Sequence, residues 1–114
     1  MKNYIKPKMR LNKEVLVVKN GKEDYEQFLL DLGIITPGNY DIVEKEKKKM
    51  VVDKHVIGSV PLGMAALCKS VTVVNFFYPK EKQGKELTLK EMYEYYEGTY
   101  RYQVNEQEVS LSEY

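Results

Sequence analysis

The residues of this sequence best suited to bind a phosphate lie in three short turns. They are Lys19, Asn20 and Gly21; Gly58, Ser59 and Val60; and Lys82, Gly84 and Lys85. Lysine ammonium groups and the free N–H groups at the beginning of a helix both attract phosphate oxygens. The spacing of the glycines matches neither a dinucleotide-binding fingerprint nor a phosphate-binding loop. In the alternative interpretation, Gly58 only permits a tight packing joint and Ser59 only caps a helix.

Other reactive side chains are scarce. His55, the sole histidine, falls in a strand-like run, where a packed or solvent-facing histidine is a better interpretation than a general base. Cys68, the sole cysteine, lies among apolar residues and suits a buried thiol better than a nucleophile. One cysteine and one histidine exclude an intrachain disulfide and a zinc cluster, so we expect no metal and no cofactor. The C-terminal tyrosines could stack bases, but more simply they pack a helix against a strand.

Apolar runs predict the strands that position the three turns. Valine-rich or aromatic segments predict strands over 14–18, 40–46, 70–78 and 99–104, and a further strand over 50–60 that is interrupted at 53–54. Helices are expected between these strands, which predicts an α/β domain with a mainly parallel sheet flanked by helices. Because ligands of such a sheet favour the carboxyl ends of its strands, we expect the three turns at one edge.

Capping signals predict where the helices begin and end. Asn20 and Glu23 have the spacing of a capping box, and an apolar stripe follows until Gly33. A second helix is predicted over 62–69, after Pro61. A third is predicted between Thr88, which forms a capping box with Glu91, and Gly98.

Composition limits the classes of function. The chain has 114 residues, which suits one domain over 14–104 between an irregular arm (1–13) and an acidic tail (105–114). The formal net charge of +1 argues against binding of long duplex nucleic acid. No apolar run reaches the length of a membrane span, and the N-terminus lacks the core of a signal peptide. We therefore expect a cytoplasmic protein with no membrane partner.

Two segments carry motifs of a known family. These are "HVIGSVPLGMAALCKSVTVV" (55–74) and "YPKEKQGKELTLKEMYEYYEGTYRYQV" (78–104). They resemble small CRISPR-associated accessory proteins encoded beside type III systems, which share a "viGtlP" turn, a helix with "laa" and a later "RGkEL" loop. The resemblance covers roughly the second half of the chain, with a looser match over the first strand and helix. It implies a compact Rossmann-like domain, usually a homodimer.

The same resemblance implies a function. Members of the family act as ring nucleases, which bind and cleave cyclic oligoadenylate messengers of antiviral defence; cyclic tetra-adenylate is the ring we expect first. Cleavage would need no metal, because a ribose 2′-hydroxyl attacks the adjacent phosphate. Lys85 and Ser59 would then take part in catalysis. Lys19 and Lys85 would contact phosphates, and Asn20 would contact a ribose or a base.

The chain also departs from the family pattern. The family has Thr-Arg-His where this chain has 18–20, a bulky polar residue near Gly63, and an arginine where this chain has Gln83. The alternatives are therefore a sensor or sponge that binds the cyclic ring without fast cleavage, and a small α/β protein-interaction module.

Overall fold

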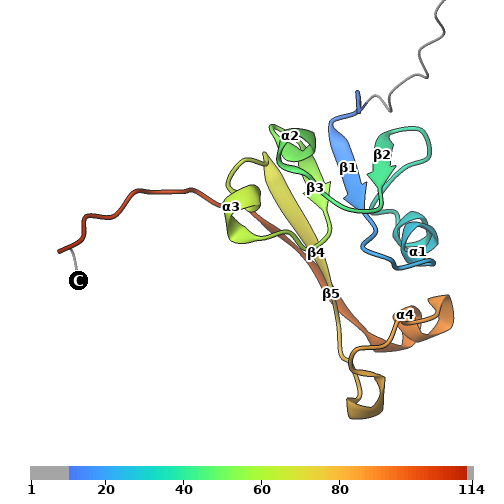
Figure 1. Ribbon diagram of the computed structural model, residues 1–114. Helices are drawn as coiled ribbons and strands as arrows, with labels where there is room; N and C mark the ends of the chain where they lie inside the picture. The colour runs from blue at the N-terminus through green and yellow to red at the C-terminus, as the bar shows by residue number, and fades with distance from the viewer. Residues whose placement is uncertain (1–10, 113–114) are drawn as a thin grey trace, which may run out of the picture.

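A computed structural model describes residues 11–112 and shows one five-stranded sheet with helices on both faces (Figure 1). The strands are β1 (Val15–Val18), β2 (Tyr40–Val43), β3 (His55–Ile57), β4 (Ser70–Phe76) and β5 (Tyr96–Tyr102). Their spatial order is β2-β1-β3-β4-β5. All neighbours pair in parallel except β4 and β5, which are antiparallel. The predicted α/β class with a mainly parallel sheet is confirmed.

Four short α-helices and one 3-10 helix connect the strands. They are α1 (Tyr25–Asp31), α2 (Lys48–Val51), α3 (Leu62–Ala65), η1 (Lys80–Lys82) and α4 (Leu89–Tyr95). The helices α1 and α4 contact each other, as do α2 and α3. Because side chains alternate along a strand, β1 contributes Val17 to one face and Leu16 and Val18 to the other.

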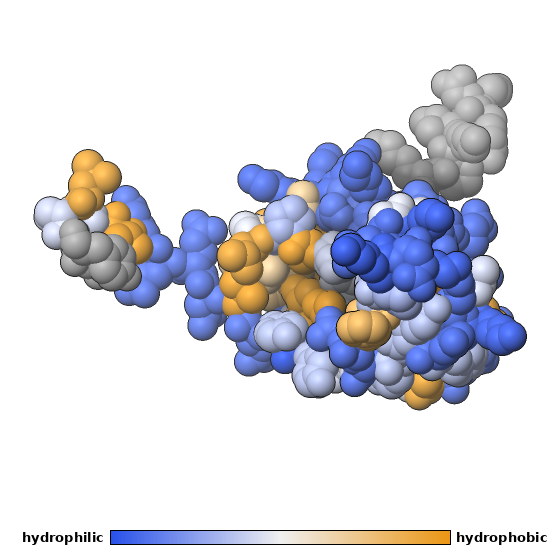
Figure 2. Space-filling view, turned by 90° about the horizontal axis from the view of Figure 1, so that it is seen from below, coloured by the Kyte–Doolittle hydropathy of each residue, from blue (hydrophilic) through white to orange (hydrophobic). Residues whose placement is uncertain are grey.

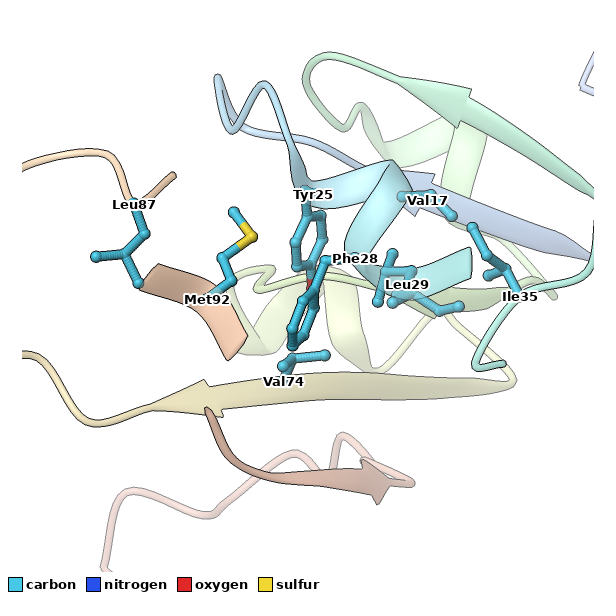
Figure 3. Close-up of a cluster of buried hydrophobic side chains, with 9 residues drawn as sticks. Val17, Tyr25, Phe28, Leu29, Ile35, Val74, Leu87 and Met92 are labelled. Atoms are coloured by element: carbon cyan, nitrogen blue, oxygen red, sulfur yellow. The ribbon is translucent and has the colours of Figure 1, made fainter. Parts of the chain in front are cut away.

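The larger core lies between the sheet and the pair α1 and α4 (Figure 3). Its buried side chains are Val17, Tyr25, Phe28, Leu29, Ile35, Ile57, Val74, Leu87 and Met92. Phe28 is fully buried, and its ring centroid lies 5.5 Å from that of Phe76 and 5.1 Å from that of Tyr93. The predicted stripe of the first helix is therefore its core-facing side, with Leu32 at its exposed margin.

Strand β1 lies where the chain changes direction across the sheet. The chain crosses from β1 to β2 on one side, and then returns past β1 to β3 on the other side. The helix after β1 and the helices after β2 and β3 therefore cover opposite faces (Figure 1). In open α/β sheets, ligands bind outside the carboxyl ends of the strands at such a point. Here these ends are Val18 of β1 and Ile57 of β3.

Several local predictions are confirmed. Thr88 caps α4, since its hydroxyl accepts the N–H of Glu91 and the Glu91 carboxylate accepts the N–H of Thr88. Gly33 has φ +75°, the left-handed conformation that ends a helix after α1. The strand predicted over 40–46 is present, although it ends at Val43, and it lies at an edge of the sheet.

Other local predictions are wrong. Asn20 does not cap a helix, because α1 begins at Tyr25 after an Asp24 cap that makes no side-chain hydrogen bond. The segment 50–52 is not strand, since Met50 and Val51 end the helix α2. The expected helix over 62–69 is one turn long. Gly98 does not end α4 either, because the helix runs directly into β5 at Tyr96 and Gly98 lies inside the strand.

The ends of the chain carry little regular structure where they are described. Residues 1–10 and 113–114 lie outside the described residues, and so does most of the predicted N-terminal arm. Residues 103–112 form no helix or strand and lead away from the body of the domain (Figure 1). Within residues 11–112, no helix is long and apolar enough to cross a membrane.

Candidate functional site

In the turn after β1, the backbone N–H groups already form hydrogen bonds within the protein. Lys19 N–H donates to the Val43 carbonyl at 2.9 Å, and Asn20 N–H donates to the Glu44 carbonyl at 2.8 Å. The N–H of Gly21 donates to the Glu44 carboxylate. Asn20 and Gly21 both have positive φ, +50° and +77°, and in this conformation their N–H groups reach the backbone carbonyl and the carboxylate of Glu44. The N–H groups of this turn are therefore already satisfied within the protein.

The turn after β3 differs in its backbone conformation and in its hydrogen bonding. Gly58 has φ +137°, and a Cβ at this position would lie 2.9 Å from the carbonyl oxygen of Val18. The close approach of β3 to β1 therefore requires glycine. The N–H groups of Ser59 and Val60 donate to no other residue within 11–112. Pro61 caps the single turn of α3, without a side-chain hydrogen bond.

The segment before α4, which follows the third turn, is hydrogen-bonded to the segment before α1, which follows the first turn. The N–H of Glu23 donates to the Glu86 carboxylate at 2.8 Å, and the N–H of Leu89 donates to the Asp24 carboxylate at 3.0 Å. These two bonds join the α1 entrance to the α4 entrance. Lys82 is engaged elsewhere, because its ammonium lies 2.5 Å from the carboxylate of Glu91.

A hollow of about 260 Å³ lies between the first and third turns. Its polar lining is Asn20, Gly21, Lys22, Tyr78, Lys85 and Glu86, and its apolar lining is Phe76, Leu87 and Met92. We call it the lysine hollow. It brings Asn20 and Gly21 together with Lys85, which the sequence places far away. Gly84, with φ +78°, belongs to the turn that presents Lys85.

Three polar side chains of the lysine hollow, Lys22, Tyr78 and Glu86, were not predicted from the sequence as site residues. The ammonium of Lys22 lies 5.2 Å from the centroid of the Tyr25 ring, and burial lowers the pKa of this lysine. Burial, with a smaller contribution from the nearby Tyr78, raises the pKa of Tyr25 to about 12. The sequence signal for Lys22 was its position directly after Gly21. Tyr78 follows the longest apolar run, but nothing in that run marked it.

Ser59 and Val60 line another hollow, of about 280 Å³, which opens on the α3 side. The rest of its lining is mostly apolar: Leu62, Ala65, Val71, Val73, Tyr102 and Val104. Figure 2 shows apolar side chains gathered on this side of the body. The structure therefore divides the predicted site between the two faces of the sheet. Lys19 and Gly58 lie between the two hollows and line neither.

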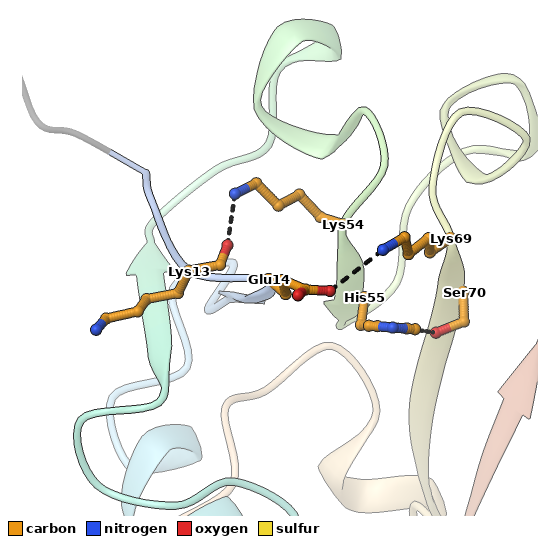
Figure 4. Close-up of polar contacts among 6 residues, drawn as sticks. All are labelled: Lys13, Glu14, Lys54, His55, Lys69 and Ser70. Carbon is orange, nitrogen blue, oxygen red and sulfur yellow. Dashed lines mark hydrogen bonds and ion pairs between the residues drawn. The ribbon is translucent and has the colours of Figure 1, made fainter.

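His55 lies at the opposite end of the strands. Its Nδ1 is 2.7 Å from the hydroxyl of Ser70, which is buried at the beginning of β4 (Figure 4). Nearby, the Lys69 ammonium lies 3.2 Å from the Glu14 carboxylate and lowers the pKa of Glu14. The histidine therefore joins a polar group at the amino ends of the strands, away from the lysine hollow.

Cys68 has the environment of a structural thiol. Its sulfur donates to the Met64 carbonyl at 3.3 Å, and burial raises the pKa of the thiol. A raised pKa lowers the thiolate fraction, which is the reactive form.

No protein-family model, curated protein or solved structure matches this chain. The site therefore has to be interpreted from its own geometry and from the motifs of the sequence.

Proposed function

We propose that this protein is a Rossmann-like ring nuclease that binds and cleaves cyclic oligoadenylate in antiviral defence. The proposal rests first on the resemblance to small CRISPR-associated accessory proteins. The fold is compatible with it, because the strand order β2-β1-β3-β4-β5 provides a ligand position at the carboxyl ends of β1 and β3.

The lysine hollow is the observation that carries the proposal. Lys22 and Lys85 come from separate turns and line the same space together with Asn20. Two lysines and the ring of Tyr78 in one hollow favour a ligand that has both negative charge and an apolar ring. A phosphate with its attached nucleoside has both properties.

The size of the hollow limits what it binds. At about 260 Å³ it lies below the roughly 300–1,000 Å³ of drug-sized ligand pockets, so it suits one nucleotide and not a complete ring. The rest of the ring would extend along the carboxyl edge toward Lys19 and Ser59. A homodimer would present this edge twice, which suits a symmetric cyclic ligand.

The proposed reaction is an internal transfer. The ribose 2′-oxygen bonds to the phosphorus of the adjacent 3′-phosphate and loses its proton to solvent. The bond from phosphorus to the 5′-oxygen breaks, and that oxygen takes up a proton. The products are a linear oligonucleotide with a 2′,3′-cyclic phosphate and a free 5′-hydroxyl.

Four of the predicted side chains have a role in this reaction. Lys85 and Lys19 would neutralise charge on the phosphate oxygens, and Asn20 would hold a ribose or a base. The hydroxyl of Ser59 and the N–H groups after it would fix the geometry for in-line attack.

A second candidate function is binding without fast cleavage, as a sensor or sponge. It is favoured by the position of His55 at the opposite end of the strands. Within residues 11–112, no imidazole lines the lysine hollow, and the one carboxylate that lines it, Glu86, already accepts the N–H of Glu23. Cleavage would then depend on positioning and charge alone.

One experiment tests both candidates. Purified protein is incubated with cyclic tetra-adenylate or cyclic hexa-adenylate in the presence of a metal chelator, and the products are separated by chromatography. A linear product with a 2′,3′-cyclic phosphate end supports the ring nuclease. An intact ring together with a rise in melting temperature supports the sensor or sponge. An intact ring without a shift overturns both proposals.

The variant Lys85→Ala assigns the activity to the lysine hollow. A hydrogen bond to a charged group contributes about 1.5–3 kcal/mol, so we expect ring affinity to fall by roughly tenfold to a hundredfold. Lys90→Ala is the matched control, because Lys90 is an exposed lysine of α4 that does not line the hollow. Equal affinity of Lys85→Ala and Lys90→Ala would contradict the assignment.

A further inference from the structure

Strand β5 is an open edge of the sheet. It is seven residues long, it contains no lysine or proline, and most of its residues are exposed. Edge strands leave a row of unpaired N–H and C=O groups, and natural sequences usually blunt them with lysine, proline or short length. The other edge, β2, has four residues and is followed by a run of lysines. Of the two edges, β5 is therefore the one suited to accept another strand.

The side chains of β5 suit an interface. Tyr96, Tyr100 and Tyr102 have exposed fractions of 37%, 49% and 50%. Tyrosine is enriched in protein–protein interfaces because its ring packs while its hydroxyl stays hydrated.

The sequence of β5, "YEGTYRY", is complementary to itself when read in the opposite direction. If Thr99 lies opposite the partner's Thr99 in an antiparallel pair, Gly98 lies opposite the partner's Tyr100, and Glu97 comes beside the partner's Arg101. The pairing repeats at both ends, so two Glu–Arg contacts form. Opposite charges across an antiparallel pair are stabilising.

We propose that β5 pairs with β5 of a second copy of this chain, antiparallel and about a two-fold axis at Thr99. The two sheets then form one continuous sheet of both protomers. This interface is isologous, because the same strand is used on both sides. The proposal concerns the assembly of the protein and does not depend on which ligand the lysine hollow binds.

Charge selects this register over its neighbours. Opposed residues in an antiparallel pair must both point their N–H groups toward the partner or both away from it, so the axis passes through a residue. An axis at Gly98 would place Arg101 opposite the partner's Tyr95, and an axis at Tyr100 would place it opposite the partner's Thr99.

Within residues 11–112, neither Glu97 nor Arg101 forms an ion pair inside the protomer. Both charges are available to a partner.

A β-bulge near the beginning of β5 is compatible with this pairing. Asn75 lies opposite Gly98 and Phe76 opposite Tyr96, so Glu97 has no residue opposite it on β4. The bulge ends the regular alternation at Gly98, so the side chain of Glu97 would reach the partner's Arg101 from just beyond the regularly paired residues. Glutamate and arginine are long enough to meet diagonal neighbours about 7–8 Å apart.

Charge reversal tests the proposal. We expect wild-type protein at about 100 μM to have the mass of a dimer in light scattering. Glu97→Arg and Arg101→Glu each place like charges opposite one another at both ends, so each should weaken the dimer at least about tenfold. The double variant restores opposite charges and should restore the dimer. Glu106→Arg, which makes the same change of charge outside the strand, should leave the dimer intact.

Two outcomes would overturn the proposal. One is a wild-type protein that remains monomeric at this concentration. The other is a dimer that both single reversals leave unchanged. Circular dichroism and thermal unfolding confirm that the variants fold, and both side chains are exposed, so their folding should be preserved.

A cysteine placed on the axis tests the register directly. In a Cys68→Ser background, Thr99→Cys brings two cysteines together across the axis, where antiparallel Cα atoms are about 4.5–5.5 Å apart, within the range of a disulfide. We expect a covalent dimer on mild oxidation. Gln103→Cys, beyond the end of the strand, should not crosslink. Crosslinking of Gln103→Cys without Thr99→Cys would rule out the register.

Discussion

The turns after β1 and after β3 lie side by side at the carboxyl edge of the sheet, but they use their backbones in opposite ways. The first turn combines positive φ at Asn20 and Gly21 with N–H groups that are already bonded to Val43 and Glu44. In the second turn, Gly58 has positive φ and lies close to the carbonyl of Val18. The N–H groups of the next residues, Ser59 and Val60, have no acceptor among residues 11–112.

The comparison shows that a glycine with positive φ and free backbone N–H groups are two separate properties of a turn. In the first turn, positive φ curves the backbone around Glu44, so the glycine serves the attachment of β2 to β1. In the second turn, the glycine allows two strands to approach, and the N–H groups of the next two residues donate to no other residue within 11–112. Of the two turns, the second therefore has unused backbone donors, while the first places Asn20 and Lys22 in the lysine hollow.

The largest expected effect is that of Gly58→Ala. An alanine at φ +137° is strained, and its Cβ would meet a backbone oxygen at 2.9 Å, which cannot move without shifting β1. Strain and overpacking each cost about 1–3 kcal/mol, so we expect a loss of roughly 2–6 kcal/mol in the free energy of unfolding. Urea denaturation followed by circular dichroism measures it.

Gly63→Ala is the matched control for this change. Gly63 lies in α3 and has no positive φ, and a Cβ added there would have no heavy atom within 4 Å. Alanine favours a helix over glycine by about 0.5–1 kcal/mol, so this variant should be neutral or slightly stabilised. If both variants lose the same stability, the close approach at Val18 is not the cause.

A smaller effect is expected for Gly21→Ala in the first turn. Its φ of +77° strains an alanine, but the nearest atom to the new Cβ is a Glu44 oxygen at 4.0 Å, so nothing clashes. The left-handed conformation costs about 1–2 kcal/mol for a residue with a Cβ. The same urea measurement should place this variant between Gly63→Ala and Gly58→Ala. A loss as large as that of Gly58→Ala would remove the distinction between the turns.

The smallest effect concerns pH, through Tyr25 at the end of the first turn. Its pKa in the folded protein is raised to about 12, above the ordinary value of about 10. The folded state therefore keeps the proton longer than the unfolded state. The resulting stability is complete below about pH 10 and is lost as the pH rises toward about 12, with a loss of about 1 kcal/mol near pH 11.

Tyr25→Phe should remove this alkaline loss. The lowered pKa of Lys22 acts in the opposite direction, so the comparison is made between wild type and Tyr25→Phe, both of which keep Lys22. The difference between their urea midpoints is followed from about pH 9 to about pH 11. Tyr102→Phe controls for the loss of one exposed hydroxyl. If wild type and Tyr25→Phe respond equally to pH, burial of Tyr25 does not control the alkaline transition.

Local patterns predicted much of the fold because each depends on near neighbours in the sequence. Thr88 and Glu91 cap α4 from three residues apart, and Gly33 ends the α1 region. The prediction failed where two local signals competed. Met50 and Val51 are apolar like a strand, but they follow a run of lysines and complete a helical turn that packs on the sheet. Gly98 signals a helix end, yet the antiparallel ladder with β4 places it inside a strand.

The candidate site was predictable as residue types and not as an arrangement. Lysines, asparagine and glycine in three turns indicated phosphate chemistry. The pairing of Lys82 with Glu91 and the bond from Gly21 to Glu44 depend on how the folded chain places these side chains. For the same reason, Lys22 and Tyr78 could not be assigned to one hollow in advance.

The α/β class follows from the order of the residues, because the alternation of apolar strands with amphipathic helices permits few other ways to bury them. The self-complementary order of charges along β5 is likewise a property of seven consecutive residues. The folded arrangement, in contrast, sets which turn has N–H groups without an acceptor among residues 11–112, and on which face of the sheet Lys85 and Ser59 lie. These depend on strand order and crossover direction, which arise from packing the whole chain around one sheet.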